Sequence, residues 1–319
     1  MAMVPAVSVV IPVFNSEPTL RAAIDSARNQ SLRDLEIIVV DDGSTDGSLN
    51  LALTIAAGDE RIRTVSFARN GGKPRAMNHA MELARGRWLA VLDADDSFHP
   101  QRLERLVALG EQAGVDMVAD DQNHLDSVTG AVVTSGFQGY RFTNPIDRSG
   151  FLRLANRPHK EFDFGILKTV TRTDFIKRHG LRYNELAGLG EDFYFLMEFF
   201  VRGGTLWVTD EALYNWTLPF SPSTRRWTTT GLGAWRYDYR RTFPAHNQYL
   251  TLMQNGGETD MLRMLRRRGR RMRQMMSYTD AQRAASEQRP FTALRILALH
   301  PSTVPVLLRR IVRRYRRQW

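Results

Sequence analysis

The stretch Trp88-Leu-Ala-Val-Leu-Asp-Ala-Asp-Asp96 decides how the chain is expected to fold. Its first five residues are apolar and follow an Arg-Gly-Arg turn, which is typical of a short strand buried on both faces. The strand ends on three carboxylates, Asp93, Asp95 and Asp96. In open α/β sheets, ligands bind at the carboxyl ends of the strands. The stretch therefore predicts an acidic ligand site at one edge of a parallel sheet.

Asp93 and Asp95 are two residues apart and can converge on one cation where the chain turns. All-oxygen ligands suit Mg²⁺ or Mn²⁺, and such sites commonly share the metal with substrate phosphates. A plainer interpretation is that acidic residues end a strand and begin a turn, because Asp is a good turn former. For an isolated Asp-x-Asp the plainer interpretation is favoured, so the rest of the chain has to decide.

Residues 1–120 alternate between strand and helix patterns. Repeated β–α units imply a mainly parallel sheet covered by helices on both faces. The expected strands lie at residues 7–13, 35–40, 62–67, 88–92 and 116–119, and the expected helices begin near residues 16, 48, 74 and 100.

The pattern weakens after this region. Residues 123–168 are rich in Gly, Asn and Pro and predict loops, with a hairpin near residues 131–134. The later pattern predicts helices over 173–178 and 193–201 and two strands, at 205–209 and 212–218.

Several classes of protein are excluded by what the sequence lacks. There is no cysteine, which excludes disulfides and thiolate metal sites. No apolar stretch of about 18 residues predicts a membrane span. The apolar run over residues 7–14 contains Pro12, so we interpret it as a first strand and not as a signal peptide. Neither a Gly-x-Gly-x-x-Gly dinucleotide fingerprint nor a P-loop is present.

The positive charge is concentrated near the C-terminal end. Residues 262–319 contain 16 Arg, no Lys and two acidic residues, a net charge of +14, so residues 1–261 carry −4 of the total of +10. A mildly acidic body argues against nucleic acid as a partner. We therefore predict a globular domain over residues 1–220 and a basic, mostly helical extension over residues 221–319.

Two segments of this extension, residues 261–276 and 304–319, place apolar residues at helical spacing among arginines. Basic amphipathic helices suit an anionic membrane surface. The alternatives are nucleic-acid binding and a helical appendage that packs on the globular domain. We favour membrane docking, which predicts a cytoplasmic protein peripherally associated with the inner (plasma) membrane.

Polar residues also follow the first two expected strands and precede a late helix. Asn15 follows the first strand and Asp41-Asp42-Gly43 follows the second, so both should meet the edge that carries Asp93. The acidic pair can bind ribose hydroxyls or a base, or it can simply form a turn. Glu191-Asp192 either caps a helix or supplies a carboxylate base across the crevice.

Five motifs taken together resemble the inverting family 2 glycosyltransferases. Each is weak alone, but they occur in the family's order and spacing over roughly residues 6–218. The resemblance implies the GT-A fold, a Rossmann-like α/β domain that binds a nucleotide sugar. The motifs are Pro12-Val-Phe-Asn15, Asp41-Asp-Gly-Ser-Thr-Asp46, the segment from Asn70 to Asn78, Leu92-Asp-Ala-Asp-Asp96 and Gly190-Glu-Asp192.

The resemblance also implies roles for individual residues. Asp95 would be the main ligand of Mn²⁺ or Mg²⁺, with Asp93 beside it, and Asp192 would be the catalytic base. Many members have Ala-Arg-Asn where this chain has Ala76-Met77-Asn78, so Arg75 or Lys73 would have to replace an arginine contact there. The nucleotide sugar would be bound by Pro12, Phe14, Asn15, Asp41, Asp42, Lys73, Asn78, Asp93, Ala94 and Asp95.

The implied activity is one inverting transfer from a nucleoside diphosphate sugar. A divalent cation neutralises the leaving diphosphate, and a carboxylate takes the proton of the acceptor hydroxyl. Arg225-Arg226-Trp227 is similar to the end of the Gln-x-x-Arg-Trp motif of processive members, but Ser223 replaces the Gln, which favours a non-processive enzyme.

The donor is expected to be a UDP-sugar, by family tendency, and the acceptor a saccharide or a lipid-linked saccharide in polysaccharide assembly. His159, Lys160 and Arg172 are candidates for an acceptor subsite, although a surface or structural role is favoured for each. The rival functions are a nucleotidyltransferase, which would release pyrophosphate, and a catalytically silent membrane-anchored scaffold.

Overall fold

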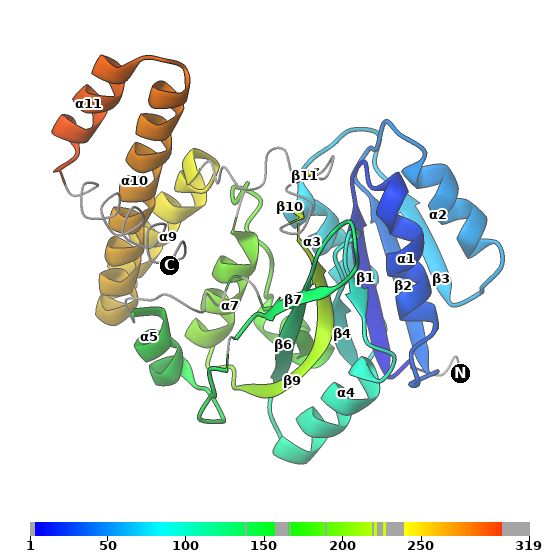
Figure 1. Cartoon of the computed structure of the whole chain (residues 1–319). Helices are drawn as coiled ribbons and strands as arrows, with labels where there is room; N and C mark the ends of the chain where they lie inside the picture. Colours follow the sequence, from blue (N-terminus) through cyan, green and yellow to red (C-terminus); the bar gives the residue numbers. More distant parts are fainter. Residues whose placement is uncertain are drawn as a thin grey trace. The chain divides into compact units, whose positions relative to one another are not determined.

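The computed structural model describes residues 4–137, 139–156, 165, 167–188, 190–218, 220–221, 226–227 and 239–301. The chain divides into two compact units, residues 1–232 and residues 233–319. Each unit is described by itself below (Figure 1). The expected domain boundary at residue 220 stays a prediction.

The first unit is built on a nine-stranded sheet with the strand order β3-β2-β1-β4-β8-β6-β9-β5, and β7 pairs with β6 (Figure 1). The strands are β1 (Val7–Val13), β2 (Leu35–Asp41), β3 (Ile62–Ser66), β4 (Trp88–Val91), β5 (Ser97–Phe98), β6 (Met117–Leu125), β7 (Val132–Ser135), β8 (Val170–Arg172) and β9 (Leu206–Thr217), with a separate pair β10 (Phe220–Ser221) and β11 (Arg226–Trp227). The helices are α1 (Glu17–Arg28), α2 (Ser48–Ala56), α3 (Lys73–Leu83), α4 (Arg102–Ala113), α5 (Arg148–Asn156), α6 (Thr173–His179) and α7 (Glu191–Val201).

The first half of the sheet is parallel, and its strands β1, β2 and β4 are buried on both faces. β1 lies between β2 and β4 and is parallel to both, and β3 extends the sheet beyond β2. Val7, Val9 and Ile11 share one buried core with residues of α1, α2 and α4, while α3 packs on β1 and β2 from the other face. The predicted α/β class, with a mainly parallel sheet flanked by helices, is confirmed.

The second half of the sheet departs from the sequence-based expectation. The strands predicted at residues 205–209 and 212–218 form one continuous strand, β9. The prediction was wrong because Thr209, Asp210 and Glu211 interrupt the apolar pattern, whereas the long pairing with β6 continues across them through a local shift of register. The expected hairpin near residues 131–134 is present, because β7 pairs antiparallel with β6.

Helix α5 was also missed, because it falls in the region predicted to form loops. Asp147 precedes the helix and accepts hydrogen bonds from the Gly150 amide at 2.7 Å and the Ser149 hydroxyl at 2.8 Å. A side chain that satisfies free groups at a helix N-terminus stabilises that end. The ring of Phe151 then stacks on Phe200 of α7, so tertiary packing supports a helix that the local composition does not predict.

Trp88 in β4 is fully buried and requires a glycine opposite it. Its indole N–H donates to Glu111 at 2.9 Å. A Cβ atom built on Gly110 of α4 would lie 2.5 Å from the Trp88 ring. The helix can therefore approach the sheet this closely only because residue 110 has no side chain.

Replacing Gly110 by Ala should lower the free energy of unfolding by about 1–3 kcal/mol, because it overpacks the core. This loss is expected although Ala is the better helix former by about 1 kcal/mol. The measurement is chemical unfolding followed by circular dichroism. The control is Gly58→Ala, whose Cβ would meet only the carbonyl oxygen of Ile55 at 3.7 Å. Equal effects of the two substitutions would contradict this account.

The second unit is helical, with η2 (Tyr239–Arg241), α9 (Phe243–Asn255), α10 (Thr259–Ser286) and α11 (Pro290–Leu299). Within the described part of the chain, no helix combines the length and the apolar composition needed to cross a bilayer. The predicted amphipathic segment 261–276 lies in α10, but its residues Met261, Leu265 and Met272 are buried. The second predicted segment, residues 304–319, lies outside the described residues.

His246 of α9 is fully buried and its ring lies against Gly269 of α10, where a Cβ atom would come within 2.5 Å of Nε2. Burial, together with the charges of Arg268 and Arg273, lowers the pKa of His246 from 6.5 to about 4. The unfolded chain takes up a proton near pH 6.5, whereas the folded chain does so only near pH 4. The neutral ring therefore contributes stability that is complete above pH 6.5 and is lost as the pH falls, by up to about 3 kcal/mol.

Wild-type protein should lose thermal stability relative to His246→Gln between pH 6.5 and pH 4. Gln has a similar polar end but cannot be protonated, so the comparison cancels the titration of all other groups. The measurement is the difference in Tm between the two proteins at pH 7.5 and at pH 4.5. A difference that does not change with pH would show that His246 does not titrate as described.

Candidate active site

Asp42, directly after β2, shapes the turn that leads into α3. Its carboxylate accepts hydrogen bonds from the amides of Gly71 at 2.9 Å and Gly72 at 2.6 Å. Gly72 has a φ of 92°, a conformation that favours glycine. The turn places Lys73 at the first position of α3, where its side chain meets the acidic residues that follow β4.

Two lysines and three carboxylates form one ion-paired cluster. Lys73 Nζ lies 2.8 Å from Asp93 Oδ1, 3.1 Å from Glu191 Oε1 and 3.7 Å from Asp192 Oδ2. Lys168 Nζ lies 2.7 Å from Asp93 Oδ2 and 2.8 Å from Asp192 Oδ2. The cluster thus joins three of the predicted site residues, Lys73, Asp93 and Asp192, although they come from α3, the end of β4 and the start of α7.

The ionisation of the cluster follows from these contacts. Burial alone would lower the pKa of Lys168, but Asp192 and Asp93 outweigh it, and the pKa is raised above its ordinary value. Burial alone would raise the pKa of Asp93, but Lys168 and Lys73 hold it well below its usual range. Both groups are therefore charged at neutral pH.

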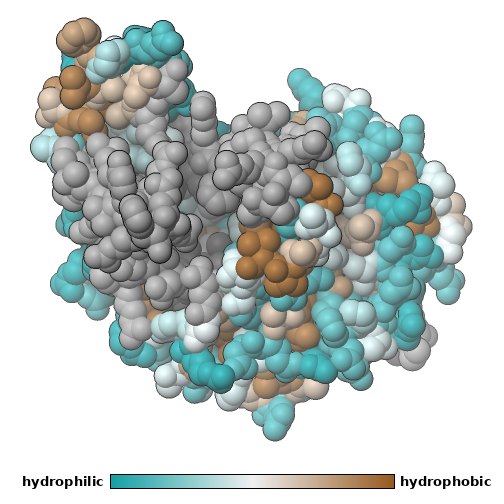
Figure 2. All heavy atoms as spheres, viewed as in Figure 1, coloured by the Kyte–Doolittle hydropathy of each residue, from teal (hydrophilic) through white to brown (hydrophobic). Residues whose placement is uncertain are grey.

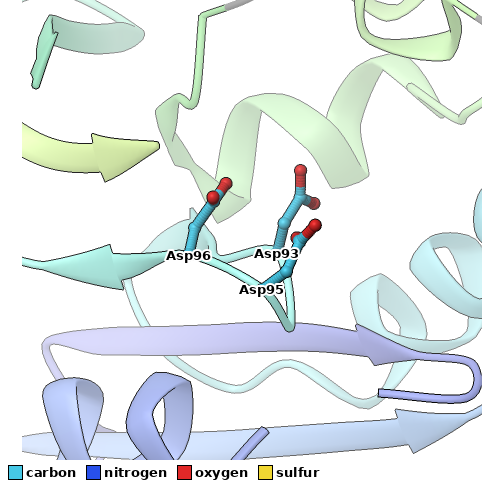
Figure 3. Close-up of side chains that lie close together, drawn as sticks. All are labelled: Asp93, Asp95 and Asp96. Atoms are coloured by element: carbon cyan, nitrogen blue, oxygen red, sulfur yellow. The ribbon is translucent and has the colours of Figure 1, made fainter. Parts of the chain in front are cut away.

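The three carboxylates after β4 have different surroundings. Ligand atoms of Asp93, Asp95 and Asp96 lie within 4.8 Å of one another, and Figure 3 shows the carboxyl groups of Asp93 and Asp95 next to each other. Asp96 is buried and accepts hydrogen bonds from the Tyr214 hydroxyl at 2.7 Å and the Thr217 amide at 2.9 Å. Asp95 is exposed, so it is the carboxylate most available to a ligand.

This donor set fits a hard divalent cation, because all of its ligand atoms are carboxylate oxygens. Among the described residues, Asp95 is in no ion pair that it would have to give up to bind such an ion. Asp93 is already neutralised by two ammonium groups, and burial together with the charges of Asp95 and Asp93 raises the pKa of Asp96 well above its ordinary value. Asp96 therefore acts mainly through Tyr214, whose hydroxyl also accepts a hydrogen bond from the Asp93 amide at 3.2 Å.

Other predicted donor-binding residues hold neighbouring segments of the chain. The side-chain oxygen of Asn15 accepts a hydrogen bond from the Thr45 amide at 2.8 Å. The side chain of Asn78 bonds both backbone groups of Tyr183, at 2.8 and 2.9 Å. Asp41 is buried and accepts from the Ser44 amide at 3.2 Å. These contacts are structural, so the donor-binding roles of these residues stay predictions.

The remaining predicted residues lie at the same sheet edge with different exposure. Pro12 is partly buried near the end of β1, and Phe14, just beyond β1, is 46% exposed. Ala94 is buried between the two carboxylates. The exposed Phe14 ring offers an apolar surface of the kind on which a base can stack, whereas Ala94 can contact a ligand mainly through its backbone.

Sequence reasoning did not identify Lys168, which lies in no recognised motif. One compositional signal was available: among the 44 Lys and Arg residues only four are lysines, at positions 73, 160, 168 and 177. Two of these four lie in the cluster. In a chain whose cations are nearly all arginines, each lysine can be tested as a position that needs a compact ammonium group.

Arg172, considered for an acceptor subsite, has structural contacts. Its guanidinium lies 4.5 Å from the centroid of the Trp88 ring and pairs with Glu111 at 2.8 Å. His159 and Lys160 lie outside the described residues, and so does Arg225.

Residues 8–161 match the family model described as Glycosyl transferase family 2. Succinoglycan biosynthesis protein ExoU of Rhizobium meliloti (strain 1021) is 35% identical over 190 residues, which cover 59% of this chain and 54% of the relative. Succinoglycan biosynthesis protein ExoO of the same organism is 32% identical over 212 residues, which cover 66% and 60%. The chain thus spans little more than half the length of these curated relatives.

Solved structures with a similar fold include S. aureus TarS 1–349, at 22% identity and a TM-score of 0.54, covering 66% of this chain and 60% of that chain. The mannosyltransferase PcManGT from Pyrobaculum calidifontis, in complex with GDP-Man and Mn²⁺, has 16% identity and a TM-score of 0.55, covering 98% of this chain and 81% of that chain. At these identities the similarity concerns the fold alone. It agrees with the GT-A architecture that the motifs implied.

Proposed function

We propose that this chain, whose residues 8–161 match the family 2 glycosyltransferases, transfers one sugar from a nucleoside diphosphate sugar to an acceptor hydroxyl, with inversion at the sugar carbon. The observation that carries the proposal is the ion-paired cluster. It joins Asp93, at the sheet edge where a donor would bind, to Asp192, at the start of α7. A donor-binding carboxylate and a candidate base thus share one site.

The transfer needs one base and no covalent intermediate. The acceptor oxygen forms a bond to the anomeric carbon while the bond from that carbon to the diphosphate oxygen breaks. The bonding electron pair leaves with the nucleoside diphosphate, and Asp192 takes the proton of the acceptor hydroxyl. General base catalysis of this kind typically contributes 10²–10⁴-fold.

Asp95 and Asp93 would hold a Mn²⁺ or Mg²⁺ ion, which supplies charge stabilisation to the leaving diphosphate when it is bound. Two ammonium groups already neutralise Asp93. Of Asp93, Asp95 and Asp96, Asp95 is then the carboxylate most available to the ion in the absence of a nucleotide. A single carboxylate binds such ions weakly. The ion and the nucleotide should therefore bind together.

Calorimetry should show that uridine diphosphate binds in the presence of Mn²⁺ and at least about tenfold more weakly without it, and that Mn²⁺ alone binds weakly. Asp95→Asn should weaken the metal-dependent binding by at least about tenfold, or about 1.4 kcal/mol. The control is Asp174→Asn, which changes an exposed carboxylate on α6 and should leave binding unchanged.

The outcomes separate the rival functions. Release of pyrophosphate, and not of a nucleoside diphosphate, from the sugar donor would favour a nucleotidyltransferase. If uridine, guanosine and thymidine diphosphates all fail to bind with any divalent metal, the chain is a scaffold and the proposal is wrong.

The names of the relatives ExoU and ExoO refer to succinoglycan biosynthesis, and this supports a saccharide acceptor. We further propose that the acceptor is lipid-linked and lies at a membrane. Helix α11 provides a surface of the appropriate kind. Its outer side exposes Phe291, Leu294 and Leu299, at 85%, 62% and 66%, while Ala293 faces inward. Figure 2 shows this hydrophobic surface in brown at the upper left, where Figure 1 places α11.

The positive charge near this apolar surface favours an anionic partner. Arg289 precedes the helix, Arg295 lies one turn from both Phe291 and Leu299, and residues 288–319 contain no acidic residue. An exposed helix face that combines apolar side chains with cations suits the interface of an anionic bilayer. We therefore assign membrane docking to α11 and not to segment 261–276, whose apolar face is occupied.

The full chain should sediment with vesicles that contain phosphatidylglycerol and much less with vesicles of phosphatidylcholine alone. Leu294→Ser should weaken this binding about tenfold, because burying one leucine contributes about 1.5–3 kcal/mol. The matched control is Leu53→Ser, which changes a leucine of α2 that is 50% exposed. Binding that is insensitive to Leu294→Ser would contradict the assignment of membrane docking to α11.

A further inference from the structure

Lys168 is the less exposed of the two lysines of the cluster, and residues outside the site fix its position. Its side chain is 9% exposed, against 27% for Lys73. Its carbonyl oxygen accepts a hydrogen bond from Arg102 at 2.6 Å, and Arg102 is itself paired with Asp120 at 2.7 Å. Both partners of that pair are fully buried. The segment that carries Lys168 is therefore anchored to α4 and β6.

The two lysines are placed for different tasks. Lys73 is the more exposed and reaches three carboxylates over distances from 2.8 to 3.7 Å, so a donor diphosphate can approach it. Lys168 makes two short contacts, to one oxygen of Asp93 and one oxygen of Asp192. Its ammonium group thus ties the donor side of the site to the candidate base.

The contacts of Asp192 are unequal at its two carboxylate oxygens. Lys168 donates to Oδ2 at 2.8 Å, and Lys73 lies 3.7 Å from the same oxygen. Among the residues that the structure describes, Oδ1 has no hydrogen-bond partner. A carboxylate with one oxygen engaged and its backbone fixed in the first turn of a helix has a defined orientation.

We propose that Lys168 is a positioning residue for the transfer: by holding Oδ2 of Asp192 it directs Oδ1 toward the acceptor hydroxyl, whose proton Oδ1 receives. This inference rests on the proposed function. The position needs a compact ammonium group, because Lys168 bridges two separate carboxylates, whereas the planar fork of arginine matches one carboxylate through two parallel bonds.

The test compares Lys168→Met, Lys168→Arg, Asp192→Asn and the double variant Lys168→Met/Asp192→Asn with the wild-type chain. The control is Lys177→Met, which removes a lysine outside the cluster whose ammonium group donates to the carbonyl oxygen of Ala84 at 3.3 Å. The measurements are calorimetric binding of uridine diphosphate with Mn²⁺, the rate of uridine diphosphate release from uridine diphosphate sugars, and Tm.

Lys168→Met should keep nucleotide binding within about fivefold and lower the release rate by about 10²-fold or more, within the range of a lost general base. Lys168→Arg should keep the fold, the charge and nucleotide binding and should still be slow. Asp192→Asn added to Lys168→Met should lower the rate little further, because two residues that act as one unit are not additive. It should also raise Tm above that of Lys168→Met, since it removes a buried carboxylate that has lost its nearer cation.

Three results would overturn the inference: a release rate for Lys168→Met above about one third of wild type, full activity of Lys168→Arg, or additive rate losses in the double variant. If Lys168→Met does not fold, Lys168→Arg provides the test: a slow release rate supports the role of Lys168, and full activity overturns it. Failure of the wild-type chain to bind any nucleoside diphosphate would instead refute the proposed function, and the role of Lys168 with it. A wild-type chain that binds and releases uridine diphosphate, together with a fast Lys168→Arg variant, refutes the role of Lys168 alone.

Discussion

The rest of the site depends on one electrostatic constraint, which is that three carboxylates close together in a poorly solvated place need cations between them. Like charges at such distances disfavour one another's ionisation. Here two ammonium groups alternate with Asp93, Glu191 and Asp192, so each of these carboxylates has a partner. The backbone places both lysines between these carboxylates. Asp42 holds the turn that precedes Lys73, and the buried Arg102 holds the carbonyl group of Lys168.

The parts of the fold that could be predicted are those in which local pattern and tertiary structure agree. β1, β2 and β4 are apolar on both faces, and their observed ends lie close to the expected ones. β8 has only three residues, and it is a strand because it pairs antiparallel with both β4 and β6. Pairing of this kind is decided by the surrounding sheet and leaves little signal in the local sequence.

The same division applies to the site and to the basic extension. Motif order was enough to predict Lys73, Asp93 and Asp192, which the structure brings together, but no motif contains Lys168. Helical spacing predicted amphipathic helices in the extension, yet spacing does not reveal which apolar face is already covered. In α10 the apolar residues face inward, whereas Phe291 of α11 faces outward.

The place of β8 in the sheet has a consequence for the order of folding during synthesis. β8 lies between β4 and β6, so these earlier strands have no direct link until residues 170–172 have left the ribosome. Tyr214, which supports the loop of Asp93 and Asp96, is made later still. The matched segment 8–161 therefore ends before the centre of its own sheet can close. Such non-local pairing makes folding slow and leaves the edges of β4 and β6 exposed in the nascent chain, where they are open to association with other strands.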